Sequence, residues 1–525
     1  MKLCITKIVS SFLILLILTG CATSSNTKQN GEAVFDGMSS QDLILRAYEH
    51  DPQAQYELGL RYELGKGLPE SFKDAVYWMR SAAKQGHIEA KFRLGGYHII
   101  IAKKLFDEAK FDEAKKMFLS AKEWLEPIAN NGHPKAQHEM ARLYSEGLGV
   151  KKNWAIAEKW YRLAADQGDP FAEENLGRAY FSRGESGKVD YKIAAKYLHR
   201  SAKKGLVLSQ YFLGTMYLNG HGVEQSNEEA FTWIRKSAEN GFDVAQNDVA
   251  SMYSNGQGTA VNEQEAIKWF KKSVAQNNTD AQANLGKRYL IGKGVVQNIH
   301  KAKRLLSKAA EKGNAHAAYD LASFYANQNF ARFKNSKEAF KWFRLAALKK
   351  LEISYGYVIK FCKAINCNTN ELQDIISNIK DSAKAGSSKS LHVLGYMYET
   401  GVGVKKEMTL SALNYYKSAR SGNRASFDRL VSIYSSNDNL NLSGNDLLVL
   451  FKDYASKKAP SAYCGVGLVY LKDKDFIDDY KNAYFWMMQC VKYGYTIYQD
   501  KLYQLEKKLT PSEITKLKNK ISLKN

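Results

Sequence analysis

Residues with the potential for catalysis or metal binding are few and scattered in this 525-residue chain. The nearest pair among the ten histidines, His133 and His138, is five residues apart across a proline, a poor spacing for metal ligands on a helix. Adjacent carboxylates such as Glu173 and Glu174 are expected on solvated helix faces. There is no HExxH motif, nucleophile elbow or Walker loop. The sequence therefore predicts a protein that is not an enzyme and that holds neither metal nor cofactor.

One cysteine near the N-terminus has a distinctive setting. Lys2 and Lys7 flank the start of an apolar stretch at 8–18, and Leu18-Thr19-Gly20-Cys21 follows directly. This arrangement resembles a bacterial lipoprotein signal, with an ordinary signal peptide or a signal anchor as the alternatives. The resemblance implies cleavage before Cys21, lipid attachment to its thiol and, because Ala22 follows, sorting to the outer membrane of a Gram-negative cell, on the periplasmic side.

The N-terminal region therefore divides into a signal peptide at 1–20 and a lipidated cysteine with a flexible polar linker at 21–40. The net charge of the chain is +22, which favours acidic or anionic partners. Outside the cytoplasm, nucleic acid is not an available polyanion. We therefore expect no nucleic-acid binding, and contact with the membrane through the lipid alone.

A small residue recurs every 36 or 37 residues, with one interval of 46, and defines about twelve units between residues 51 and 495. Each unit predicts two amphipathic helices joined by a turn that carries Gly-x-Gly in six copies. Because these glycines lie between two helices, they indicate positive φ rather than a phosphate cradle. The recurring small residues are Gly59, Gly95, Ala141, Gly177, Gly214, Ala250, Gly286, Ala322, Val358, Gly395, Val431 and Gly467.

Seven of the eight tryptophans fall at one position of the second predicted helix. A tryptophan that recurs in helical register indicates packing rather than an aromatic ligand cage. On this reasoning Trp160→Ala lowers the free energy of unfolding by roughly 3 to 5 kcal/mol. The seven are Trp78, Trp124, Trp160, Trp233, Trp269, Trp342 and Trp486.

The second helix follows the pattern Ala-x-x-Trp-x-x-x-Ala-Ala-x-x-Gly, as in residues 75–86. Together with the Leu-Gly pair of the first helix, this pattern resembles the Sel-one-like repeats (SLR) of the tetratricopeptide superfamily, over residues 51–495. The resemblance implies an all-α fold, a right-handed α-solenoid of about twelve two-helix repeats. It also implies a non-catalytic scaffold that binds envelope proteins through a concave face lined by the first helices.

Departures from the repeat suggest the domain organisation. Repeats 1 to 8 occupy 41–351, and ten extra residues near 103–115 predict either a longer helix or a protruding finger. Residues 352–387 lack both the Gly-x-Gly turn and the tryptophan, which indicates a degenerate repeat or a joint. Repeats 10 to 12 occupy 388–495, and 496–525 contains a capping helix that begins at Thr510-Pro511-Ser-Glu513.

Four cysteines remain if Cys4 is removed with the signal and Cys21 is lipidated. In an oxidising compartment the expected disulfides are Cys362–Cys367 and Cys464–Cys490, and isolated buried thiols are the alternative.

The positive charge is concentrated at 268–363, which holds 20 Lys and Arg against 5 Asp and Glu. A basic strip there could bind an anionic polysaccharide in exopolysaccharide export, whereas solvated lysine-rich helix faces are the simpler interpretation. An envelope hydrolase is a remote third reading, because no nucleophile or acid–base pair stands out. The candidate contacts within this segment are Lys287, Arg288, Lys301, Lys303, Arg304 and Lys341. Arg142 and Arg178 are further candidates, because they share with Lys287 the variable position just after the Leu-Gly pair of the first helix.

Overall fold

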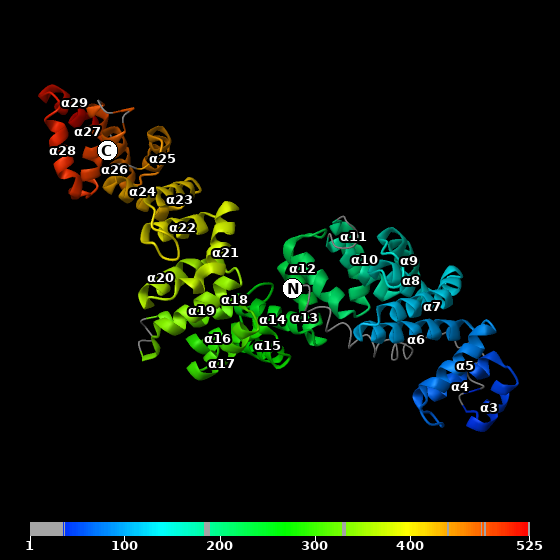
Figure 1. Cartoon of the computed structure of the whole chain (residues 1–525). Coiled ribbons are helices and arrows are strands. Elements are labelled where there is room, and N and C mark those ends of the chain that lie inside the picture. Colours follow the sequence, from blue (N-terminus) through cyan, green and yellow to red (C-terminus); the bar gives the residue numbers. More distant parts are fainter. Residues whose placement is uncertain are drawn as a thin grey trace. The chain divides into compact units, whose positions relative to one another are not determined.

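The computed structural model describes residues 35, 37–182, 189–327, 332–437, 440, 442–473, 475–476 and 479–522. Cys21, the predicted signal peptide and most of the predicted linker lie outside this range. Within it the chain forms α-helices and short 3-10 helices and no strand (Figure 1). No helix of the described part combines the length and the apolar character needed to cross a membrane.

The chain divides into two compact units, 1–273 and 274–525, with the boundary in the last turn of α15. Helix α3 (Ser40–Tyr48) opens the first unit, and helices in consecutive pairs follow it. The pairs are α4 (Pro52–Leu64) with α5 (Phe72–Lys84), α6 (Ile88–Asp107) with α7 (Phe111–Asn130), α8 (Pro134–Glu146) with α9 (Trp154–Asp166), α10 (Pro170–Phe181) with α11 (Tyr191–Lys203), α12 (Val207–Asn219) with α13 (Asn227–Glu239), and α14 (Asp243–Asn255) with α15 (Glu263–Ala275).

The second unit continues the same alternation and ends in two further helices, α28 (Gln499–Glu506) and α29 (Pro511–Ser522). Its pairs are α16 (Thr279–Ile291) with α17 (Ile299–Glu311), α18 (Ala315–Ala326) with α19 (Ser336–Leu348), α20 (Tyr355–Ile365) with α21 (Gln373–Lys384), α22 (Ser388–Thr400) with α23 (Met408–Arg420), α24 (Arg424–Ser436) with α25 (Gly444–Ser456), and α26 (Pro460–Lys472) with α27 (Tyr480–Lys492). Short 3-10 helices lie at Glu352–Ser354, Thr369–Leu372 and Thr496–Tyr498. The twelve pairs of the described chain confirm the predicted α-solenoid.

The Gly-x-Gly turns have two separate physical roles. The first glycine ends the first helix in the left-handed conformation, as Gly220 does at φ 67°. The second glycine, also at positive φ, lies against the start of the preceding repeat's second helix. A Cβ on Gly258 would lie 1.9 Å from the carbonyl oxygen of Asn227, so only glycine allows the two repeats to approach this closely. These are turns, as the sequence predicts.

The recurring small residue of the first helix sets the distance between the two helices of a pair. A Cβ on Gly214 would lie 2.4 Å from Ile234, and one on Gly177 would lie 2.5 Å from Leu198. Real Cβ atoms do not approach this closely, so the second helix packs directly on the backbone of the first. First helices of successive repeats also touch, as α10 touches α12 and α16 touches α18. Each unit is therefore a stack of repeats whose core consists of consecutive hydrophobic clusters.

The tryptophans are less uniform than the sequence predicts. Trp78, Trp233, Trp269 and Trp342 are only 6–8% exposed and belong to the core. Trp124, Trp160 and Trp486 are half-buried. The large loss of stability expected for Trp160→Ala therefore belongs to the buried members of the set instead.

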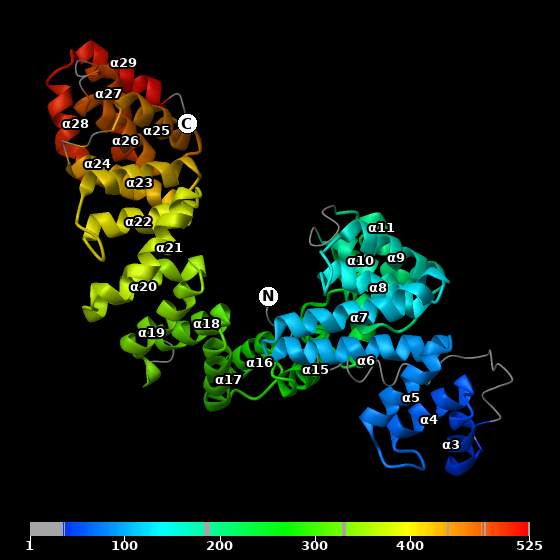
Figure 2. The same ribbon diagram turned by 45° about the vertical axis from the view of Figure 1, so that its right-hand side comes forward.

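The ten extra residues of the second repeat lengthen both of its helices. Helices α6 and α7 have 20 residues each, whereas most other helices of the stack have 13 (Figure 2). Phe106 and Phe111 meet edge to face at the tip, with ring centroids 5.1 Å apart, and both are more than half exposed. The outcome combines a longer helix with a projecting hairpin.

Residues 352–387 form α20 and α21 with 3-10 turns before each helix, and they contribute to the core of the second unit. At the C-terminus, the Thr510 backbone N–H donates to the Glu513 carboxylate over 2.9 Å. The Glu513 backbone N–H donates in return to the Thr510 hydroxyl. This is the capping box expected from the sequence.

A buried glutamine joins successive repeats in the first unit. Its side-chain amide donates to a carbonyl at the end of the preceding second helix: Gln55 to Ala47 over 2.9 Å and Gln137 to Ala129 over 3.0 Å. Gln246 makes the same bond. These bonds satisfy carbonyls that have no partner within their own helix.

Candidate binding surface

The position after the small residue of each first helix differs in chemistry from repeat to repeat. Leu60, Arg178, Thr215, Ser251, Lys287 and Ser323 share this position and are partly or fully exposed, whereas Gly96, Ile359 and Leu468 at the same position are buried. Because neighbouring first helices touch, these side chains line one face of each unit. The interior is thus constant while this face varies, which is how repeat proteins build binding surfaces.

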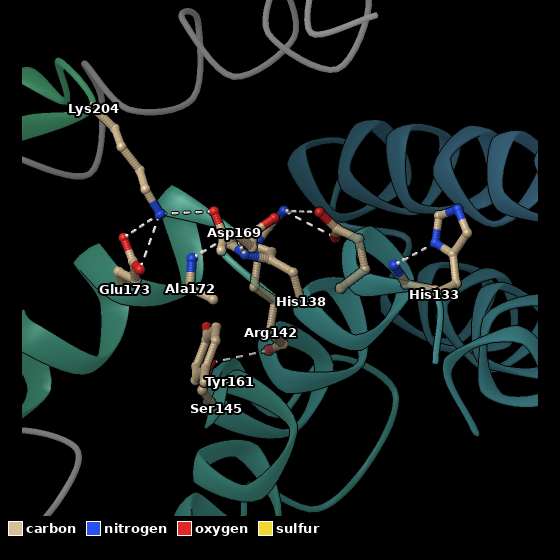
Figure 3. A network of polar contacts seen from close by, with 12 residues as sticks. His133, His138, Arg142, Ser145, Tyr161, Asp169, Ala172, Glu173 and Lys204 are labelled. Atoms are coloured by element: carbon tan, nitrogen blue, oxygen red, sulfur yellow. Dashed lines mark hydrogen bonds and ion pairs between the residues drawn. The ribbon is translucent and has the colours of Figure 1, made fainter. Parts of the chain in front are cut away.

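Arg142 holds the same position but is only 7% exposed. Its guanidinium donates to Glu139 over 3.0 Å and to Glu146 over 3.3 Å (Figure 3). Burial and repulsion by Arg142 lower the pKa of Lys103 beside it. The guanidinium is therefore committed to internal carboxylates, and its evident role is to neutralise them.

Arg178, one repeat further on, is half-exposed and lies 5.8 Å from the ring centroid of Phe212. Nearby, the Ser209 hydroxyl donates to Glu174 over 2.8 Å. Burial raises the pKa of the Glu174 carboxyl above its ordinary value. Arg178 is thus the more accessible of the two arginines in the first unit.

His138 and Asp169 form a polar contact between α8 and the start of α10. The Nδ1 of His138 lies 3.2 Å from the Asp169 carboxylate, which also accepts the Ala172 backbone N–H (Figure 3). Burial opposes ionisation of Asp169, but the contact with His138 prevails and lowers the pKa of the carboxyl. This pair caps a helix, and no nucleophile is placed beside it.

Glu173 is fully buried, contrary to the solvated position expected from the sequence. It sits where other repeats have the buried glutamine, and it pairs with Arg200 over 2.7 Å and Lys204 over 2.9 Å. Arg200 also donates to the Ala165 carbonyl over 2.9 Å, the bond that a glutamine would make. The expectation of a solvated Glu173 was wrong because it took no account of the repeat position, which is buried in most other repeats.

The other candidate basic residues all lie in the second unit. Lys287 is exposed and 3.5 Å from Asp320, and Lys341 is exposed and 3.9 Å from Glu338. Lys301 lies over the Tyr289 ring and Lys303 over the Tyr325 ring. Arg288 is half-buried and Arg304 is exposed. These residues are distributed over α16, α17 and α19 rather than gathered at one point.

Two disulfides are present in the second unit. Cys464 and Cys490, both fully buried, join α26 to α27 with 4.8 Å between their Cα atoms. Cys362 and Cys367, 4.9 Å apart at Cα, close the end of α20 where other repeats have Gly-x-Gly. Among the described residues, no group of three or more His, Cys, Asp or Glu could hold a metal ion.

Two open cavities lie beside half-buried tryptophans of the first unit. One of about 500 Å³ is bordered by Trp160, Lys159 and Asp166. The other, of about 370 Å³, is bordered by Arg80, His98, Ser120, Glu123 and Trp124. The sequence analysis did not single out Arg80 or His98. The signal was available, because His98 stands at the position where most repeats carry tyrosine.

The fold and its variable face define an α-solenoid repeat protein, and comparison with known proteins gives the family. The Sel1 repeat family matches more than half of the chain, at residues 52–87, 134–169, 170–206, 207–242, 243–278, 279–314, 315–351 and 388–423. The chain belongs to the Sel1 repeat family. Proteins built from Sel1 repeats generally mediate protein–protein interactions and are typically non-catalytic.

A solved structure with an SLR fold agrees with this assignment. The chain is similar to a protective antigen present in uropathogenic Escherichia coli strains that displays an SLR fold, with 27% identity, a TM-score of 0.60, and coverage of 92% of this chain and 93% of that one. A Sel1 repeat protein from Oxalobacter formigenes is 28% identical over 47% of this chain and 98% of its own, with a TM-score of 0.41. The chain matches none of the curated proteins.

Proposed function

We propose that this chain is a lipid-anchored, non-catalytic scaffold on the periplasmic side of the outer membrane, and that it binds envelope proteins through its first helices. The observation that carries the binding role is the variable, accessible position shared by Leu60, Thr215 and Ser251 on a constant interior. A surface whose side chains differ from repeat to repeat recognises a protein partner along its length rather than one small molecule at a single site.

The envelope location is supported by two features. Cys21 follows an apolar stretch in a lipoprotein-like signal. The disulfides Cys362–Cys367 and Cys464–Cys490 persist in oxidising compartments and are rare in the cytosol.

The binding role is tested by crosslinking in cells. A photoreactive amino acid placed at Thr215 or Ser251 reports partners on the proposed face, and the same probe at Glu239, on the second helix α13, serves as the control. A discrete protein captured from the first two positions and not from Glu239 supports the proposal. Equal capture from all three positions contradicts it.

The anchor is tested separately with Cys21→Ala. This variant is expected to lose incorporation of labelled fatty acid and to leave the membrane fraction. Retention of the label in Cys21→Ala would refute lipid attachment at this residue.

A second candidate is the binding of an anionic polysaccharide by the second unit. It is favoured by the local excess of positive charge and by exposed cations such as Lys287 and Arg304. Such binding weakens steeply with ionic strength, whereas an apolar protein interface does not. Reversal of charge at Lys287, Lys301 and Arg304 that leaves polysaccharide binding intact would exclude it.

A further inference from the structure

Two equivalent junctions of the first unit differ in the partners of one arginine, which are present at one junction (the filled junction) and replaced at the other (the open junction). The junction of the first and second repeats contains the open cavity of about 370 Å³ lined by Arg80, His98, Ser120, Glu123 and Trp124. In repeat register, Arg80 corresponds to Arg162 at the junction of the third and fourth repeats. The surroundings of these two arginines can therefore be compared directly.

At the filled junction, Arg162 is held on three sides. It donates to Glu158 over 2.8 Å, to Tyr180 over 3.0 Å and to Tyr197 over 3.2 Å. The Tyr180 hydroxyl also donates to Glu158. The Arg162 guanidinium therefore has its hydrogen-bond partners within the protein.

At the open junction, all three of these partners are replaced. Val76 stands in place of the glutamate, His98 in place of Tyr180, and Trp124 in place of Tyr197. Arg80 is exposed and forms no hydrogen bond or ion pair with the described residues. The substitutions thus create a space and leave a cation facing it.

His98, at the edge of the cavity, is incompletely satisfied by the protein. The ring is only 6% exposed, and its Nδ1 is buried without a hydrogen-bond partner. Burial lowers the pKa of His98, although the backbone carbonyl of Ser120 favours the protonated form. The buried nitrogen marks a polar group that the replaced residues of this junction leave without a partner, and the ring borders the cavity.

We propose that this cavity binds a small hydroxylated carboxylate, of which a uronic acid is the representative class. Arg80 pairs with the carboxylate in a two-pronged hydrogen bond. Glu123 and Ser120 bind hydroxyl groups, and the half-buried indole of Trp124 packs against the face of a sugar ring. The volume lies at the lower end of the range for small-molecule sites, which suits a single ring. This site is independent of the proposed protein-binding face.

The full-length protein is titrated with D-glucuronate by calorimetry and by saturation-transfer NMR. Glucose and acetate serve as the hydroxyl-only and carboxylate-only probes, and glutamate as a carboxylate with an ammonium donor. We expect a dissociation constant of order 1 mM for glucuronate and at least tenfold weaker binding of the other three. Equal binding of all four, tighter binding of glutamate, or no binding overturns the assignment.

Three variants locate the site. Arg80→Gln removes an exposed cation without internal partners, so it is expected to fold normally and to weaken glucuronate binding at least tenfold. His98→Tyr restores the residue found in most repeats and is expected to block the cavity. Arg162→Gln at the filled junction is the matched control, with lowered stability and unchanged affinity. Glucuronate binding that survives both Arg80→Gln and His98→Tyr refutes the site.

Discussion

The third and fourth repeats have the same backbone plan but satisfy one buried position in opposite ways. In the third repeat, Gln167 donates to Gln137 over 2.8 Å, and Gln137 donates to the preceding helix. In the fourth repeat, buried Glu173 accepts from Lys204 and Arg200. One interior site is neutral and the other ionic, because the requirement is only that every buried polar group has a partner.

The comparison shows how a repeat protein tolerates a buried charge. Compared with the third repeat, the fourth has different partners as well as a different buried residue. Lys204 caps the end of α11 where Gln167 caps the end of α9, and Arg200 donates to the Ala165 carbonyl. The ionic version depends on several residues at once, whereas the neutral version depends on two. The following predictions, from the largest effect to the smallest, test this difference.

Removing both cations of the fourth repeat has the largest expected effect. Arg200→Ala with Lys204→Ala leaves Glu173 buried without a counter-charge and removes the side-chain donor of the Ala165 carbonyl, which still accepts the Gly168 backbone N–H. The loss of stability is expected to be about 3 to 5 kcal/mol. Urea unfolding followed by circular dichroism measures it.

The control for this variant converts the ionic site into the neutral one. Glu173→Gln with Lys204→Gln recreates the glutamine pair of the third repeat and is expected to change stability by less than about 1.5 kcal/mol. A loss as large as that of the double alanine variant would show that the two sites are not interchangeable.

The small residue gives the next largest effect, because the third repeat has Ala141 where the fourth has Gly177. A Cβ on Gly177 would lie 2.5 Å from Cγ of Leu198, so Gly177→Ala forces the helices apart and is expected to lower stability by about 1 to 3 kcal/mol. Gly177→Ala with Leu198→Ala provides the necessary room. If Gly177→Ala lowers stability as much in the Leu198→Ala background as in the parent protein, overpacking is not the cause.

Gln137→Ala tests the neutral site of the third repeat. It removes the side-chain donor of the Ala129 carbonyl, which still accepts the Gly132 backbone N–H, and deprives Gln167 of an acceptor, with an expected loss of about 1 to 2 kcal/mol. Because no ion pair is broken, the loss is expected to be the same in low and high salt. A marked dependence on salt would assign the effect to the charges nearby instead.

The helix N-caps give the smallest effect, and it depends on pH. The Nδ1 of His87 accepts the Ala90 backbone N–H at the start of α6, and burial lowers the pKa of His87 below its ordinary value of 6.5. The stabilisation is therefore complete above that value and lost as pH falls through the lower folded pKa. The protection factors of the amides at the start of α6, corrected for the pH dependence of intrinsic exchange, are expected to fall severalfold below pH 6, and not in His87→Asn.

Asp169 at the start of α10 is the internal control for this measurement. Its pKa is lowered in the folded state, so its capping contribution is present at neutral pH and is lost only as pH falls well below 4. The protection factors at the start of α10 should stay unchanged between pH 7 and pH 5. A parallel fall of the protection factors in both helices would indicate a general loosening of the stack rather than titration of a cap.

The repeat register could be read from the sequence because its signals are local. Gly220 and Gly222 mark a turn, Pro170 marks a helix start, and Thr510 with Glu513 marks a capping box, each through the conformation of a few consecutive residues. The candidate binding surface was harder to predict from the sequence. Arg178 and Arg142 occupy the same repeat position, yet one is half-exposed and the other is buried between glutamates.

The sequence by itself determined the twelve-pair α-solenoid and membership of the repeat family, because periodic apolar residues and glycines specify helices, turns and stacking order one repeat at a time. Only the tertiary structure decided which polar residues are committed to the interior. The fate of Glu173 and Arg80 depends on residues on other helices, distant in the sequence, that stacking brings alongside. Desolvation and pairing are properties of that three-dimensional neighbourhood, so no local pattern encodes them.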